Sequence, residues 1–276
     1  MVDKQKIVIK PMAQIIYLSH GGGPLPILGD TGHKEMVSFM KNLPNKIVKP
    51  KAIIVISAHW EEAVPTVIAS EKPSLLYDYY GFPQEAYEIQ YQAPDNISLV
   101  HQIQEVFKIK GFALEIDKNR GLDHGVFIPL LMMYPQADIP VTQISLIRGL
   151  DPQKHLQLGE VLSQFTNENT LIIGSGFSFH NMREFDWSGT NISDEANDNF
   201  QDWLADVCTE QYSQQEREEK LKNWAMAPGA RYCHPREEHL LPLHVCCGTA
   251  KKKGTIIFDN YILGKRAIAI QWKSQQ

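Results

Sequence analysis

The fold is decided by apolar runs such as Lys51-Ala-Ile-Ile-Val-Ile-Ser-Ala-His-Trp60, in which a β-branched segment ends in a serine and a histidine. A run this apolar predicts a strand that is buried on both faces of a sheet. Similar runs occupy residues 13–18, 141–146 and 171–176, and each leads into a polar or glycine-rich turn. The chain is therefore expected to form several neighbouring central strands.

Segments with helical periodicity separate these runs. Residues 33–42, 97–108 and 152–165 repeat apolar side chains at helical spacing. Strands that alternate with helices predict an α/β fold. Two late runs, at 254–258 and 266–272, predict a terminal strand pair. We expect one domain over residues 1–276, with a mixed central β-sheet flanked by helices.

The acidic stretch from Ser188 to Arg231 differs from the rest of the chain. It is polar, and only its centre, around Phe200, Leu204 and Val207, has helical apolar spacing. We interpret it as a surface excursion with a helical centre rather than as a second domain.

Composition excludes several classes of protein. The chain has 276 residues, of which 43% are hydrophobic and 21% charged, an ordinary globular mixture. Its net charge of −5 and the lack of a long Lys/Arg run argue against nucleic acid as a partner. No apolar stretch reaches the ~18 residues of a membrane span, and the first residues lack the apolar core of a secretion signal. We expect a cytoplasmic protein, and the sequence leaves self-association into a homo-oligomer open.

The four cysteines, at positions 208, 233, 246 and 247, have neither C-x-x-C nor zinc-knuckle spacing. We expect buried, reduced structural thiols. No glycine-rich nucleotide-binding loop follows a predicted strand, which disfavours a nucleotide cofactor.

Histidines lie where the apolar runs end. His20 follows the first run, His59 the second, and His180 comes shortly after the run at 171–176. Because ligands of open α/β sheets gather beyond the carboxyl ends of the strands, these three side chains are expected to share a site. A turn containing Asp123 and His124 adds a fourth candidate, in which Asp123 is expected to orient the imidazole.

The segment 233–244 carries further candidates whose roles the sequence does not separate: His234, Glu238, His239 and His244. Neutral imidazoles, with or without one carboxylate, suit Zn(II) or non-haem Fe(II). Three protein ligands leave coordination positions open for a substrate or O₂, and a further histidine can move protons. The absence of His-Glu-x-x-His argues against a helix-borne zinc protease. A nucleophile elbow needs glycine two residues before and two residues after its serine, and around Ser175 these positions hold Ile173 and Phe177.

Six motifs occur in order over nearly the whole chain: Ser19-His-Gly-Gly-Gly-Pro24, Ser57-Ala-His-Trp60, Tyr80-Gly-Phe-Pro83, Asp123-His-Gly125, Ser178-Phe-His-Asn181 and Glu238-His-Leu-Leu-Pro-Leu243. Their order and content resemble the DOPA 4,5-dioxygenase type within the class III (LigB-like) extradiol ring-cleaving dioxygenases. The resemblance implies an α/β fold and one mononuclear metal site for Fe(II) or Zn(II). It also implies that the ring of a small catechol is opened by O₂, beside the diol, to a semialdehyde.

The resemblance assigns metal binding to four histidines: His20, His59, His239 and His180. It also makes His180 a candidate acid/base, assisted by His124 at the substrate pocket. Glu238 stays a rival to His239, because some relatives use a glutamate as the third ligand. Three aromatic residues are expected to line the substrate: Tyr80, Phe82 and Trp60.

The loop after His20 departs from the Gly-Ser-Pro found in some family members. Three consecutive glycines, residues 21–23, predict a loosely held loop without the hydroxyl. Three arginines are candidates to meet a substrate carboxylate: Arg120, Arg183 and Arg236.

Two other functions fit the same residues. A zinc-dependent hydrolase would use an open Zn(II) position to activate water, independently of O₂. A non-catalytic metal-binding relative would keep the site and form no product, because a fold does not by itself imply an activity.

Overall fold

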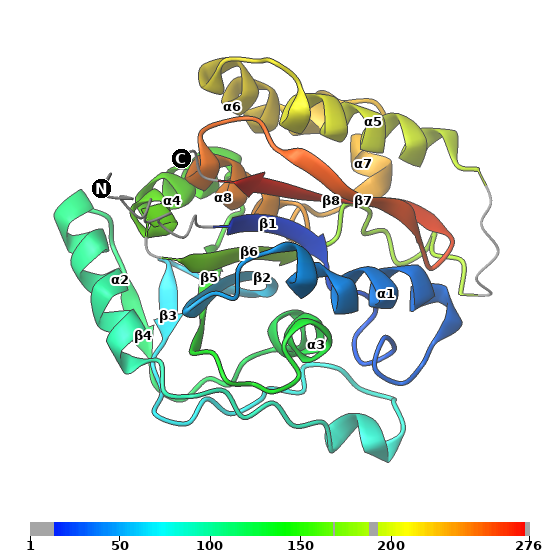
Figure 1. Ribbon diagram of the computed structural model, residues 1–276. Coiled ribbons are helices and arrows are strands. Elements are labelled where there is room, and N and C mark those ends of the chain that lie inside the picture. Colours follow the sequence, from blue (N-terminus) through cyan, green and yellow to red (C-terminus); the bar gives the residue numbers. More distant parts are fainter. Residues whose placement is uncertain (1–13, 168, 188–192, 274–276) are drawn as a thin grey trace, which may run out of the picture.

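An eight-stranded mixed sheet forms the centre of the computed structural model, which describes residues 14–167, 169–187 and 193–273 (Figure 1). Its strands are β1 Gln14–Ser19, β2 Ala52–Glu62, β3 Thr66–Ile68, β4 Glu115–Asp117, β5 Val141–Ile147, β6 Thr170–Gly176, β7 Thr255–Ile262 and β8 Lys265–Lys273. They lie in the order β4-β3-β5-β2-β6-β1-β8-β7. The central strands β5, β2, β6 and β1 are parallel, whereas β3 joins β5, and β8 joins β1, in antiparallel fashion.

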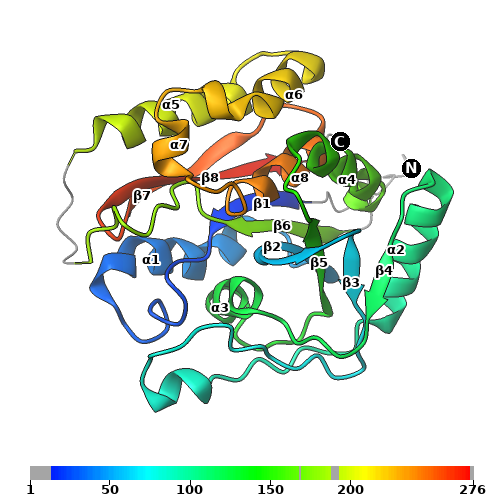
Figure 2. The ribbon, with the colours of Figure 1, turned by 180° about the vertical axis from the view of Figure 1, so that it is seen from behind.

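Helices cover both faces of this sheet. They are α1 Lys34–Asn42, α2 Ile97–Lys110, α3 His124–Met133, α4 Pro152–Leu162, α5 Glu195–Thr209, α6 Gln214–Lys222, α7 Ala230–Cys233 and α8 Leu241–Ala250. Helices α1 and α3 lie on one face, and α4, α5 and α8 lie on the other (Figures 1 and 2). The predicted α/β class, the mixed sheet and the terminal strand pair are confirmed.

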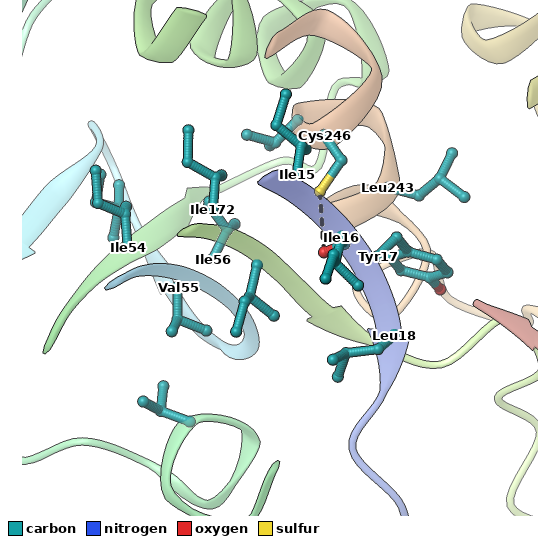
Figure 3. Packing of buried hydrophobic residues seen from close by; sticks show 14 of the residues in the cluster. Ile15, Ile16, Tyr17, Leu18, Ile54, Val55, Ile56, Ile172, Leu243 and Cys246 are labelled. Carbon is teal, nitrogen blue, oxygen red and sulfur yellow. Dashed lines mark hydrogen bonds between the residues drawn. The ribbon is translucent and has the colours of Figure 1, made fainter. Parts of the chain in front are cut away.

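Close packing brings α8 directly onto the central strands. A Cβ atom at Gly174 of β6 would lie 2.5 Å from the carbonyl oxygen of Pro242, so only glycine permits this approach. Cys246 of α8 points at β1, with its Sγ 3.6 Å from the carbonyl oxygen of Ile16 (Figure 3). The amino end of α8 is thereby held near the carboxyl end of β6, and the middle of the helix packs on β1. All four cysteines are buried and free, as the sequence predicts.

Two expectations need correction. Strand β2 does not end before the histidine: it continues through His59 to Glu62, and its register against β5 shifts between Ile56 and Glu61. The predicted surface excursion is instead a structural layer, because α5 packs on β8 and buries Phe200 and Leu204 completely. Helical periodicity indicated the helix but not the sheet face beneath it. Residues 188–192 of that stretch lie outside the described residues.

No helix within the described ranges is both long and apolar enough to span a membrane.

Candidate metal centre

Three histidines converge at the carboxyl ends of the central strands. His20 follows β1 directly, and its backbone N–H donates to the carbonyl of Gly176 at the end of β6, 3.0 Å away. His59 lies in the irregular part of β2, and His239 lies just before α8. One ring nitrogen from each histidine lies within 4.8 Å of the others. The structure therefore brings together three residues that are up to 219 positions apart in the chain.

The spacing of these nitrogens suits a metal ion. The Nε2 atoms of His20 and His59 are 3.0 Å apart. Two nitrogen ligands ~2.1 Å from a common ion, at an angle of ~90°, are separated by ~3.0 Å. The spacing of His20 and His59 therefore fits a bound Zn(II) or Fe(II) ion.

A buried serine orients His20. The hydroxyl of Ser175, on β6, donates to the carbonyl of Gly125, so its oxygen is the acceptor for His20 Nδ1–H at 3.0 Å. This arrangement assigns the proton to Nδ1 and leaves a lone pair on Nε2, which faces the cluster.

His239 is held through both its backbone and its ring. Its carbonyl accepts hydrogen bonds from the Tyr17 hydroxyl (2.9 Å) and the Phe177 N–H (3.0 Å). A Cβ at Gly176 would lie 2.1 Å from the same carbonyl. The Glu238 carboxylate accepts from His239 Nδ1–H at 2.9 Å, which leaves Nε2 available. In this geometry Glu238 orients the imidazole of His239 by a hydrogen bond, whereas the sequence left Glu238 as an alternative metal ligand.

His124 is oriented by Asp78 and not, as expected, by Asp123. Both the backbone N–H of His124 and its Nδ1–H donate to Asp78 Oδ1, at 3.0 and 2.8 Å. Asp78 also lies 3.6 Å from Nδ1 of His59. Asp78 has no motif of its own in the sequence, although it directly precedes the aromatic residues Tyr79 and Tyr80.

Asp123 instead supports the backbone beneath the site. It is fully buried, accepts from Ser57 Oγ at 2.7 Å, and also accepts from the side-chain amide of Gln143. Ser57 Oγ in turn accepts from the backbone N–H of His59 at 3.2 Å. The reason for the difference is that the Asp123 carboxylate is engaged by Ser57 and Gln143, whereas Asp78 accepts from both N–H groups of His124.

His180 stacks on His239, with ring centroids 3.3 Å apart and planes 14° apart. Its Nδ1 is 3.4 Å from Glu238 Oε1. His180 is therefore close to the cluster, and the group His180, Glu238 and His239 could itself hold an ion.

Burial and mutual repulsion favour the neutral form of His20, His59 and His239. Desolvation, followed by the charge of neighbouring histidines, holds the pKa of His20, His59 and His239 well below the usual value. Burial alone would raise the pKa of Asp78 and Glu238. The hydrogen bonds and charges of His124 and His180, respectively, outweigh it and lower both pKa values. Neutral nitrogen ligands flanked by ionised carboxylates favour a divalent cation.

The other two histidines of the segment 233–244 are structural. His234 lies against the carbonyl of Ser178 (2.9 Å), and burial lowers its pKa to about 3. His244 lies against the carbonyl of Leu221 (2.9 Å), and burial lowers its pKa as well.

A pocket of about 380 Å³ opens above the cluster. His20, His59, His124, His180 and His239 all lie in its lining. This size is suitable for a small aromatic molecule. The histidine cluster therefore forms part of a pocket that a ligand can enter.

Comparison with known proteins identifies the family. Residues 14–268 match the family described as the catalytic LigB subunit of aromatic ring-opening dioxygenase. The chain belongs to the LigB family. Dioxygenase tasH of Hapsidospora irregularis is 38% identical over 273 residues, which cover 91% of this chain and 83% of that protein. The 4,5-DOPA dioxygenase extradiol of Beta vulgaris is 38% identical over 255 residues, covering 90% and 91%.

The fold agrees with this assignment. The crystal structure of an uncharacterized protein from Escherichia coli K12 superposes with a TM-score of 0.76 at 26% identity, covering 95% of this chain and 99% of that one. The family and the relatives show that this LigB protein is an extradiol ring-opening dioxygenase.

The predicted aromatic wall of this LigB protein is only partly present. Phe82 and Tyr80 line the pocket, although Tyr80 is 91% exposed, and the unpredicted Tyr79 lies beside them. Trp60 is not in the lining: its ring packs under Arg120 and its Nε1–H donates to Glu62. The physical reason is that neighbouring residues of a strand point to opposite faces, so Trp60 turns away where His59 turns in.

The glycine loop is more firmly held than its composition suggests. The N–H of Gly22 donates to His33 Nε2 at 2.9 Å, and Nδ1–H of His33 donates to Asp30 at 2.7 Å. A Cβ at Gly21, where φ is +85°, would come within 2.9 Å of His33. The loop is therefore pinned in one conformation, contrary to the expectation of a loose loop.

Proposed function

We propose that this LigB-family dioxygenase holds one Fe(II) through His20, His59 and His239 and opens the ring of a small catechol beside its diol. The observation that carries the proposal is the convergence of three neutral imidazoles at the base of a ligand-sized pocket, with 3.0 Å between the Nε2 atoms of His20 and His59. Zn(II) would occupy the same ligands, but the family's use of O₂ favours a redox-active metal.

When bound, such an ion supplies a Lewis acid that lowers the pKa of a catechol hydroxyl and a route for electron density between substrate and O₂. The protein would contribute the movement of protons. Asp78 holds Nδ1–H of His124, so Nε2 of His124 is free to accept a proton from a catechol hydroxyl, and the Asp78 carboxylate stabilises the resulting imidazolium.

We propose His180 as the second proton carrier. Its ring lies in the pocket lining, and its Nδ1 faces Glu238 at 3.4 Å. The carboxylate would stabilise a protonated His180, which could then deliver a proton as the ring opens. The His180 ring stacks in parallel on that of His239.

Metal content and turnover test the proposal together. Protein reconstituted anaerobically with Fe(II), then exposed to air and a panel of catechols, is expected to form a semialdehyde with visible absorbance. His239→Ala is expected to lose the metal. Glu238→Gln is expected to retain it with about 10–100-fold lower affinity, as is typical of residues that orient a ligand.

Glu237→Gln is the matched control, because Glu237 is the neighbouring carboxylate and pairs with Arg231 at 2.7 Å, away from the cluster. Its metal content should equal that of the wild type. Full metal retention in His239→Ala would contradict the ligand assignment. A metal-loaded protein that forms no product from any catechol would contradict the reaction, and O₂-independent turnover with Zn(II) would indicate a hydrolase instead.

We also propose a cytoplasmic location, since four free, buried thiols are typical of a reducing compartment.

A further inference from the structure

The described lining of the pocket contains no lysine and no arginine. Apart from the histidines, its polar side chains are few: Asp78 is engaged with His124, and the Tyr79 hydroxyl donates to the carbonyl of Ala86 at 2.6 Å. The remaining wall consists largely of apolar side chains: Leu25, Phe82, Phe177, Phe185 and Leu263. A ligand that enters this part of the pocket meets no cationic side chain.

Apolar side chains also gather at the exposed edge of the pocket. Tyr80, Met182 and Trp187 all line it, and they are 91%, 56% and 52% exposed. They make up three of the seven large hydrophobic residues that are exposed among the described residues. Clustered exposed apolar surface marks a binding site, because water there is readily displaced by an apolar group.

The arginines proposed from the sequence do not supply the missing charge. Arg120 donates to the carbonyl of His59 at 3.2 Å and stacks on Trp60, outside the lining. Arg236 is paired with Glu61 and Glu238. Arg183 is exposed on the loop after Met182 and is not among the lining residues.

We propose that this pocket selects catechols with an uncharged, apolar ring substituent over catechols with a carboxylate or amino-acid substituent. The proposal rests on the proposed function, in which the diol lies at the histidine cluster and the substituent extends along the apolar wall. A carboxylate there would lose hydrating water without gaining a cationic partner, whereas an alkyl group would bury against Phe82, Phe185 and Met182.

Binding measurements without O₂ test this selectivity independently of turnover. The Zn(II)-loaded protein is titrated calorimetrically, without O₂, with 4-methylcatechol, 4-tert-butylcatechol, 3,4-dihydroxybenzoate and DOPA. The alkylcatechols are expected to bind at least ~10-fold more tightly than the two charged compounds, because an unpaired buried charge is costly. The ratio of kcat/KM values with Fe(II) should follow the same order.

A new cation at the pocket edge should narrow the preference for alkylcatechols. Met182→Lys is expected to improve binding of 3,4-dihydroxybenzoate by up to ~5-fold, the effect of one partly exposed ion pair, and not that of 4-methylcatechol. Met226→Lys is the matched control, since Met226 is 86% exposed and lies outside the pocket. It should change neither affinity.

Equal or tighter binding of the carboxylate compounds to the wild type would overturn the selectivity, and loss of that binding in Arg183→Ala would identify the cation responsible. If the alkylcatechols bind preferentially but are not cleaved with Fe(II) and O₂, the selectivity stands and the proposed reaction fails. If no catechol binds, both fail.

Discussion

Replacing Ser175 by alanine tests how the site prepares His20 for a metal. The Ser175 side chain is fully buried, and its hydroxyl lies between His20 Nδ1–H and the carbonyl of Gly125. Ser175→Ala leaves that donor and that acceptor without a partner and frees the ring to place its proton on Nε2. An unpaired buried polar group costs ~1–3 kcal/mol, so the loss of both partners should lower the free energy of unfolding by about 2–6 kcal/mol.

Metal affinity shows whether Ser175→Ala disturbs the orientation of the His20 imidazole or only destabilises the fold. Loss of a residue that orients a ligand lowers metal affinity by about 10–100-fold, which corresponds to about 1.4–2.7 kcal/mol of binding free energy. Competition with a chromophoric chelator measures it for Zn(II). Ser145→Ala is the matched control, because Ser145 is equally buried on β5 and accepts from the Thr66 N–H at 3.0 Å. It should lose stability but keep wild-type affinity.

Unchanged Zn(II) affinity in Ser175→Ala would refute the reasoning, as would an equal loss of affinity in Ser145→Ala. The first result would mean that the Ser175 hydroxyl does not set the tautomer of His20. The second would mean that affinity merely follows stability.

Three other outcomes are expected. Gly176→Ala should lower stability by ~1–3 kcal/mol and weaken metal binding, because the new Cβ would overlap the carbonyl of His239; urea unfolding and chelator competition measure the two effects, and wild-type values would contradict the packing. Asp78→Asn should reduce kcat by about 10-fold with metal content unchanged, since it removes the charge that stabilises protonated His124; full activity would exclude that role. Burial lowers the pKa of His155 to about 4, so this side chain stays neutral in the folded, metal-free protein at a pH where the unfolded chain, with a pKa of ~6.5, binds a proton. The free energy of unfolding should therefore fall by up to ~3 kcal/mol as the pH is lowered from ~6.5 towards 4. Unfolding curves of wild type and His155→Gln across this range should differ in slope by about one proton, and parallel curves would contradict the assignment.

Sequence patterns predicted most of the strands and helices because the spacing of apolar residues can be read locally along the chain. An apolar run such as that ending at Ile56 specifies a strand covered on both faces wherever it lies in the sheet. The positions of His20, His59 and His180 after such runs predicted their convergence, since parallel strands end at one edge. The same patterns did not show that α5 packs on β8, because an amphipathic helix does not identify the surface that it covers.

The sequence by itself determined the fold class, the family and the histidines that gather at one pocket. Only the tertiary structure decided which partner orients each imidazole: Ser175 for His20, Glu238 for His239, and Asp78 rather than Asp123 for His124. Two of these pairings, Ser175 with His20 and Asp78 with His124, join segments that are far apart in the chain, so they depend on how the strands and loops are placed in the fold. Strand β2 is an example: because it continues past Ile56, the side chain of His59 lines the pocket and that of the next residue, Trp60, does not.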